Sequence, residues 1–105
     1  MKRFHISIAV SDVSASVTDY SKRLGCKPTV LVEGRYALWK TDILNFTISC
    51  REGQQTSMVR HIGFEDDGEK TFREERDANG ITWEYFSAET QMQEVKEKFP
   101  GVKHG

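Results

Sequence analysis

The sequence is poor in cysteine, in runs of like charge and in long apolar stretches, and each shortage excludes a class of protein. The two cysteines, Cys26 and Cys50, are too few for a disulfide framework and too far apart for a close-spaced metal pair, so we expect free buried thiols. The net charge is −1 and no basic run occurs, which argues against nucleic acid or an anionic membrane as the partner. No apolar run could span a bilayer and no signal segment opens the sequence, so we expect a cytoplasmic location.

The length of the chain, 105 residues, is that of a single domain. Hydrophobic residues make up 37% and charged residues 30% of it, which predicts a modest core under a largely polar surface. A second copy would help so small a chain to bury more apolar area, and we therefore expect a homodimer.

A short phrase, a histidine followed by alternating apolar residues, occurs near the start of the chain and again in its middle. Residues 4–8 read FHISI and residues 60–64 read RHIGF. Alternate side chains of a strand point to opposite faces, so each phrase places a histidine opposite an apolar stripe. The repeat predicts two half-modules of one domain, with His5 and His61 at equivalent places.

The first half-module, residues 3–51, predicts a strand, a helix and three further strands. Asp12 is typical of a helix N-cap, and Gly25 of a helix end that needs a positive φ. Apolar residues at helical spacing lie between them. The predicted strands cover residues 3–10, 28–33, 36–40 and 43–50, and a polar linker follows over 51–57.

The second half-module, residues 58–88, predicts a strand over 58–65 and another over 81–88. Residues 66–80 fit either a short helix or the first arm of a hairpin that turns at Asn79 and Gly80. A C-terminal helix is predicted over 89–99, before a frayed tail in which we expect His104 to have no role.

Four predicted strands share one property, a face of small or polar residues opposite an apolar face that needs a helix over it. An α+β fold follows, with a curved mixed sheet, helices outside and a concave pocket inside. His5, His61 and Glu84 would meet in this pocket as a set of two imidazoles and one carboxylate, which suits a divalent metal ion. Three protein ligands leave positions open for two oxygens of a substrate.

These features resemble the vicinal oxygen chelate superfamily, which includes glyoxalase I, extradiol dioxygenases and bleomycin-resistance proteins. The resemblance rests on the strand–helix–three-strand order, the repeated histidine and the phrase WEYF at residues 83–86. It implies paired βαβββ modules, metal ligands at His5, His61 and Glu84, and Fe, Mn, Zn, Ni or Co as the ion. It also implies general-base work by Glu84 or by a metal-bound water. Substrate contacts are expected from Asn45, Thr47, Tyr36, Trp39 and Phe86.

The second half-module departs from the pattern because it is about 17 residues short. His5 and Asn45 are 40 positions apart, whereas His61 and Glu84 are separated by 23. Either the helix or a pair of strands is therefore missing. We favour loss of the helix, which keeps Glu84 on the last strand and leaves a bare sheet face for the C-terminal helix to cover.

Three functions remain open at this stage, and whether the chain is an enzyme is one of the open points. The first is a metalloprotein of the glyoxalase or dioxygenase type, a lyase, isomerase or dioxygenase acting on a small molecule with vicinal oxygens. The second is a binding protein of the bleomycin-resistance type that needs no metal. The third is a degenerate member with a structural or regulatory role.

Overall fold

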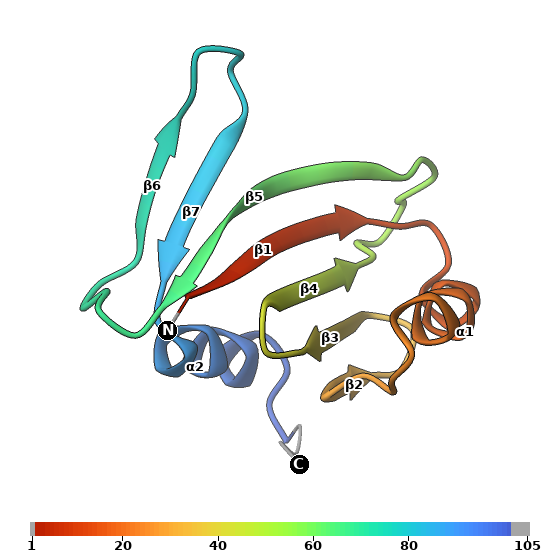
Figure 1. Cartoon of the computed structure of the whole chain (residues 1–105). Helices are drawn as coiled ribbons and strands as arrows, with labels where there is room; N and C mark the ends of the chain where they lie inside the picture. Colours follow the sequence, from red (N-terminus) through yellow and green to blue (C-terminus); the bar gives the residue numbers. More distant parts are fainter. Residues whose placement is uncertain (1, 102–105) are drawn as a thin grey trace.

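The computed structural model describes residues 2–101, and the predicted tail with His104 lies outside them. These residues form one mixed seven-stranded sheet, in the strand order β2-β3-β4-β1-β5-β7-β6, and two helices (Figure 1). The α+β prediction is confirmed, and neither helix is long and apolar enough to cross a membrane within residues 2–101. The elements are β1 (Lys2–Ala9), α1 (Val13–Leu24), β2 (Val30–Val32), β3 (Tyr36–Lys40), β4 (Leu44–Ser49), β5 (Met58–Asp66), β6 (Arg73–Arg76), β7 (Thr82–Phe86) and α2 (Ala88–Lys98).

Helix α1 forms where its capping residues and apolar stripe predict it. The Asp12 side chain accepts a hydrogen bond from the backbone N–H of Ala15 at 3.0 Å, and Gly25 ends the helix with φ 73°. The apolar stripe of α1 packs on one face of the sheet, against a core that includes Trp39 and Ile48. Both of these side chains are completely buried, so this layer is the main hydrophobic core.

Helix α2 packs on the opposite face of the sheet, and this corrects the expectation that it covers the bare face of the second half. Val95 contacts Val30 and Leu38, which are neighbours on β2 and β3. Those two side chains share the face of the sheet that carries His5, because the strands are paired in register across β3, β4 and β1. The apolar stripe of α2 therefore docks on aliphatic side chains that this mostly polar face carries at β2 and β3.

Residues 66–80 form the first arm of a hairpin, which decides between the two readings of that segment. Strand β6 pairs antiparallel with β7, and the two stand together at one end of the sheet (Figure 1). Asp77 shapes the turn, since its side chain accepts hydrogen bonds from the backbone N–H groups of Asn79 and Ile81 and from the indole of Trp83. Between β5 and β7 the described chain holds no helix, and Glu84 lies on the last strand.

Candidate metal centre

Three candidate metal ligands from three neighbouring strands meet on the face of the sheet that α2 covers in part. Nε2 of His61 lies 2.9 Å from Nε2 of His5 and 3.0 Å from Oε1 of Glu84, and the three ligand atoms all lie within 4.8 Å of one another. Adjacent donors around an ion with bonds of about 2.1 Å at right angles are about 3.0 Å apart. The two measured separations therefore match those of adjacent ligands on a divalent ion, and two imidazoles with one carboxylate are a donor set typical of iron and zinc.

The strand register explains how the three side chains come together. His5 on β1 pairs with Gly63 on β5, and Gly63 pairs in turn with Glu84 on β7. His61 pairs with Ser7, so it lies diagonally across from His5 on the same face. His5 faces the residue two positions after His61, and His61 faces the residue two positions after His5, so the two histidines occupy symmetric places on the central strand pair, as the repeated phrase predicts. Glu84 is level with Gly63 and so lies two residues from the level of His61.

Gly63 is required where β7 packs against β5. It has φ 156°, and a Cβ atom built on it would lie 1.8 Å from the backbone oxygen of Glu84. Any side chain at this position would thus push Glu84 away from the two histidines. Gly63, the glycine in the phrase RHIGF, is therefore needed to bring Glu84 close to the two histidines.

Asn45 orients the ring of His5 through Nδ1, the ring nitrogen that does not face His61. Nδ1 of His5 lies 3.0 Å from the side-chain oxygen and 3.1 Å from the backbone oxygen of Asn45, so this nitrogen carries the proton and donates it. Nε2 is then the nitrogen with a free lone pair, and it is the one that faces His61. The ring of Phe86 meets the imidazole edge-on, with centroids 4.8 Å apart, and limits its rotation.

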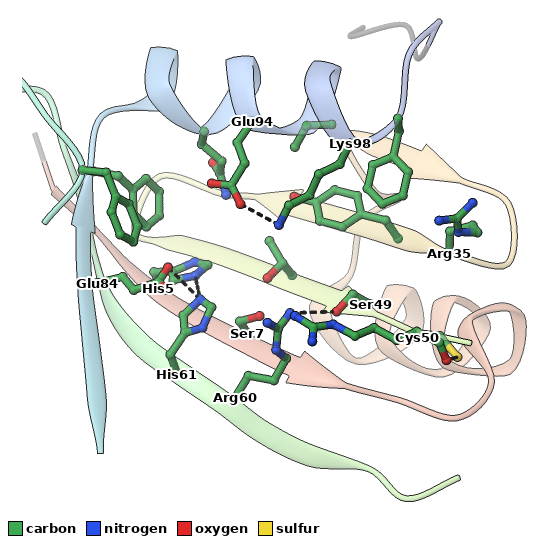
Figure 2. A pocket seen from close by; sticks show the side chains of 18 of the residues that line it. His5, Ser7, Arg35, Ser49, Cys50, Arg60, His61, Glu84, Glu94 and Lys98 are labelled. Carbon is green, nitrogen blue, oxygen red and sulfur yellow. Dashed lines mark hydrogen bonds and ion pairs between the residues drawn. The ribbon is translucent and has the colours of Figure 1, made fainter. Parts of the chain in front are cut away.

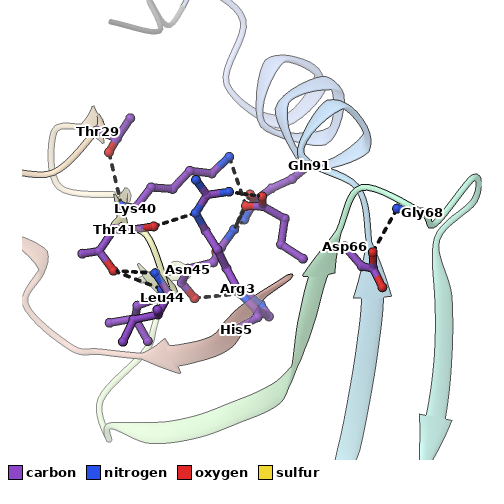
Figure 3. Close-up of polar contacts among 12 residues, drawn as sticks. Arg3, His5, Thr29, Lys40, Thr41, Leu44, Asn45, Asp66, Gly68 and Gln91 are labelled. Atoms are coloured by element: carbon purple, nitrogen blue, oxygen red, sulfur yellow. Dashed lines mark hydrogen bonds and ion pairs between the residues drawn. The ribbon is translucent and has the colours of Figure 1, made fainter. Parts of the chain in front are cut away.

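The amide of Asn45 is oriented in turn by a buried polar cluster (Figure 3). Its nitrogen donates to Glu65 and to Gln91, both at 2.8 Å, and its oxygen accepts from the Gln91 amide at 3.1 Å. Glu65 is 1% exposed and binds Arg3 at 2.6 Å and Lys40 at 3.1 Å. Because an ionised carboxylate only accepts hydrogen bonds, Glu65 determines which end of the Asn45 amide faces His5.

Two pKa shifts follow from this environment. Burial, aided by the neighbouring His61, lowers the pKa of His5, so its ring is neutral and able to bind a metal at pH 7. Burial alone would raise the pKa of Glu65, but the hydrogen bond from Asn45 and the positive charges of Lys40 and Arg3 outweigh it and lower that pKa. Glu65 is consequently an anion in the folded protein at neutral pH.

The ligand set opens into a cavity of about 500 Å³ between α2 and the sheet (Figure 2). His5, His61 and Glu84 lie at one end of it, and hydroxyl groups of Ser7, Thr47 and Ser49 line the floor. The remaining wall is contributed by aromatic, aliphatic and charged side chains, among them Tyr36, Phe72, Phe86, Val95, Phe99, Arg35, Arg51, Arg60 and Lys98. A space of this size accommodates a small organic molecule.

Of the five predicted substrate-binding residues, three line the cavity and two do not. Thr47, Tyr36 and Phe86 line the cavity, where a ligand could contact them. Asn45 is completely buried behind His5, and its role is to orient that ring. Trp39 lies in the core on the α1 face, where its indole N–H donates to Ser21, so it does not line the cavity.

Sequence reasoning missed Glu65 and Gln91. Glu65 has the appearance of an ordinary strand-end glutamate in water, yet it is almost completely buried. A signal for Gln91 was present, because it lies four residues before Val95 and so shares the buried stripe of α2, where a polar residue needs a partner. Cys26 and Cys50 are free thiols, as expected, but both are only partly buried.

We compared the chain with models of known protein families and with curated proteins, and it matches none of them.

Proposed function

We propose that the protein holds a divalent metal ion at His5, His61 and Glu84 and uses it to bind a small molecule with two adjacent oxygen atoms in the neighbouring cavity. The observation that carries this proposal is the meeting of three ligand atoms within 4.8 Å at the end of a cavity of about 500 Å³. A bound ion supplies a Lewis acid whose remaining positions accept oxygen ligands.

The residues around the site have separable roles in this proposal. Asn45 and Phe86 hold His5 in one orientation, which removes the entropy cost of ordering the ligand when the ion binds. Glu84, at the cavity wall, is the group best placed to accept a proton from a bound molecule. Such proton transfer would suit an isomerase or a lyase of the vicinal oxygen chelate type, whereas a dioxygenase would also need dioxygen and a redox-active ion such as Fe²⁺ at the three ligands.

We also propose membership of the vicinal oxygen chelate superfamily, with a shortened second module. The support is topological: β1 pairs in parallel with β4, β5 pairs in parallel with β7, and β1 and β5 meet antiparallel in the middle of the sheet. In this reading the second βαβββ module has lost its helix and one strand, and it keeps the strand that carries Glu84.

Metal binding is tested by titrating metal-stripped protein with Zn²⁺, Mn²⁺ and Fe²⁺, the last under anaerobic conditions. We expect one ion per chain for the wild type and at least a 100-fold loss of affinity in the double variant His5→Ala/His61→Ala. His104→Ala is the matched control and should bind like the wild type. Equal affinities for the wild type and the double variant would disprove the proposed metal centre.

A second candidate is a metal-free binding protein, and the aromatic wall of the cavity favours it. Tyr36 and Phe99 face one another with ring centroids 5.4 Å apart, and Phe72 and Phe86 also line the space. Planar ligands stack well on such rings. Under this alternative, a planar fluorescent probe would bind the metal-stripped protein and the double histidine variant with the affinity of the wild type.

The expected homodimer is a further part of the proposal. Neither helix of residues 2–101 covers the sheet face that carries Phe4, Phe64, Trp83 and Tyr85, where the centroids of neighbouring rings lie 5.5–6.4 Å apart. Ile81 at its edge is 43% exposed. Sedimentation velocity tests the pairing: Ile81→Lys should shift the protein towards a monomer, and an unchanged sedimentation coefficient would argue against this face as the interface.

A further inference from the structure

The cavity has a second polar end, formed by arginines. Arg35, Arg51 and Arg60 line it, and Figure 2 shows Arg60 reaching from beside His61 towards Ser49, and Arg35 on the far side from His5, His61 and Glu84. The three guanidinium groups come from three separate segments: Arg35 from the turn before β3, Arg51 from the loop after β4, and Arg60 from β5 itself. Their convergence on one space is a property of the fold.

None of these three arginines is neutralised by a carboxylate among the described residues. The guanidinium of Arg35 lies over the ring of Phe99, and Arg60 donates to the hydroxyl of Ser49 at 3.4 Å. Among the charged residues at the cavity wall, Lys98 is paired with Glu94 at 2.7 Å and Glu84 contacts His61. Among the residues of 2–101 that line the cavity, Glu52 is the one carboxylate left to offset three positive charges, so this end of the cavity is electropositive.

A β-bulge turns Arg60 towards the cavity. Ser7 pairs with His61 and the next residue, Ile8, pairs with Val59, so Arg60 has no partner on β1. In an unbroken strand Arg60 and His61 would point to opposite faces, whereas here both line the cavity. Bulges recur beside functional sites because they redirect a side chain in this way.

We propose that Arg60, with Arg35 and Arg51, binds an anionic group of the ligand, a carboxylate or a phosphate. The proposal rests on the proposed function for the other end of that ligand, whose paired oxygens face the metal centre. Ser49, the partner of Arg60, is four residues along β4 from the level of His5, which corresponds to roughly 13 Å. The ligand class is therefore an elongated small molecule with an oxygen pair at one end and an anion at the other.

Inorganic phosphate and metal-stripped protein provide the test, because phosphate cannot then bind through a metal. Chemical shifts of the arginine Nε–H groups and calorimetry report binding at low salt. We expect Arg60→Gln to weaken phosphate binding about tenfold, the loss expected for one charge-assisted hydrogen bond. Arg60→Lys, which keeps the charge, should lose less, and Arg23→Gln on exposed α1 should lose nothing.

Metal titration of the same variants separates this proposal from the proposed function. Arg60→Gln should bind Zn²⁺ as tightly as the wild type. If neither the wild type nor any variant binds Zn²⁺ while phosphate binding still depends on Arg60, the anion subsite is supported and the metal centre is disproved. If phosphate does not bind the wild type, or binds Arg60→Gln and Arg23→Gln equally well, the anion subsite is wrong.

Discussion

The imidazole of His5 donates its Nδ1 proton to Asn45, whose side-chain and backbone oxygens lie 3.0 and 3.1 Å away. This contact selects the tautomer in which Nε2 faces His61 and Glu84. Two expectations depend on it: that the ring is held still, and that its Nε2 lone pair is available. The neutrality of the ring comes instead from burial and from His61, because the hydrogen bonds to Asn45 act to raise the pKa of His5. The two residues are 40 positions apart in the sequence and level with one another on β1 and β4.

Asn45→Leu should disable the site without removing a ligand. The substitution removes the side-chain acceptor of His5, which keeps only the backbone oxygen of residue 45, and it takes one hydrogen-bond donor from Glu65 and the Asn45 amide from Gln91. We expect a loss of about 2 kcal/mol in the free energy of unfolding, and a 10–100-fold loss of metal affinity. Urea unfolding and Zn²⁺ titration measure the two effects. Retention of wild-type metal affinity would show that His5 does not need Asn45.

The stability of the protein should depend on the ionisation of Glu65. Its pKa is lowered from 4.5 in the folded state, so the unfolded chain binds the proton more readily. The contribution of Glu65 is therefore complete above pH 4.5 and is lost as the pH falls through the folded pKa. Urea unfolding of the wild type between pH 3 and pH 7 should show this decline.

Glu65→Gln provides the matched comparison for that decline. At neutral pH we expect it to be less stable by about 3 kcal/mol, because Arg3 and Lys40 lose the anion that pairs with them. Its stability should also fall less steeply than that of the wild type at acid pH. Parallel curves for the two proteins would mean that other carboxylates cause the acid sensitivity.

Glu84→Gln tests whether the carboxylate completes the metal centre. Glutamine keeps the size of the side chain but not its charge, and a neutral amide oxygen is a weaker ligand for a divalent ion. We expect at least a tenfold loss of Zn²⁺ affinity with little change in unfolding free energy, since the Glu84 side chain is at the cavity wall. Glu97→Gln, on the exposed side of α2, should leave the affinity unchanged.

Gly63→Ala should separate β7 from β5. The added Cβ would overlap the backbone oxygen of Glu84, and backbone atoms cannot rotate away as a side chain would. We expect a loss of more than about 2 kcal/mol in stability together with the loss of metal binding. Gly68→Ala is the control, because its Cβ would lie 3.4 Å from the nearest atom, on the Asp66 side chain. Equal melting temperatures for both variants would contradict the close packing at Gly63.

The parts of the fold that the sequence predicts are those with strong local signals. Asp12 and Gly25 mark both ends of α1, and the alternation of polar and apolar residues marks the strands that carry His5 and Glu84. The three ligands follow from that alternation, because it places them on one face whatever the details of pairing.

The bulge at Arg60 and the surroundings of Glu65 are beyond such reasoning. One extra residue in a strand moves the side chains that precede it to the other face of the sheet. The sequence around Arg60 contains no pattern that would predict such a bulge. Likewise, Arg3, Lys40 and Glu65 look like three unrelated surface charges until strand pairing brings them together. Long-range register determines both features, and a local pattern carries no information on it.

The amide pair between Gln91 and Asn45 makes the C-terminal helix part of the ligand-binding equilibrium. Gln91 is the point at which α2 contacts the residue that orients His5, so undocking the helix would release that orientation as well as open the cavity. By thermodynamic linkage, an ion that binds the ordered imidazole more tightly must hold α2 in place by the same free energy. The proposed metal centre and the wall of the cavity would in this sense form one cooperative unit, so that binding at either would change the affinity at the other.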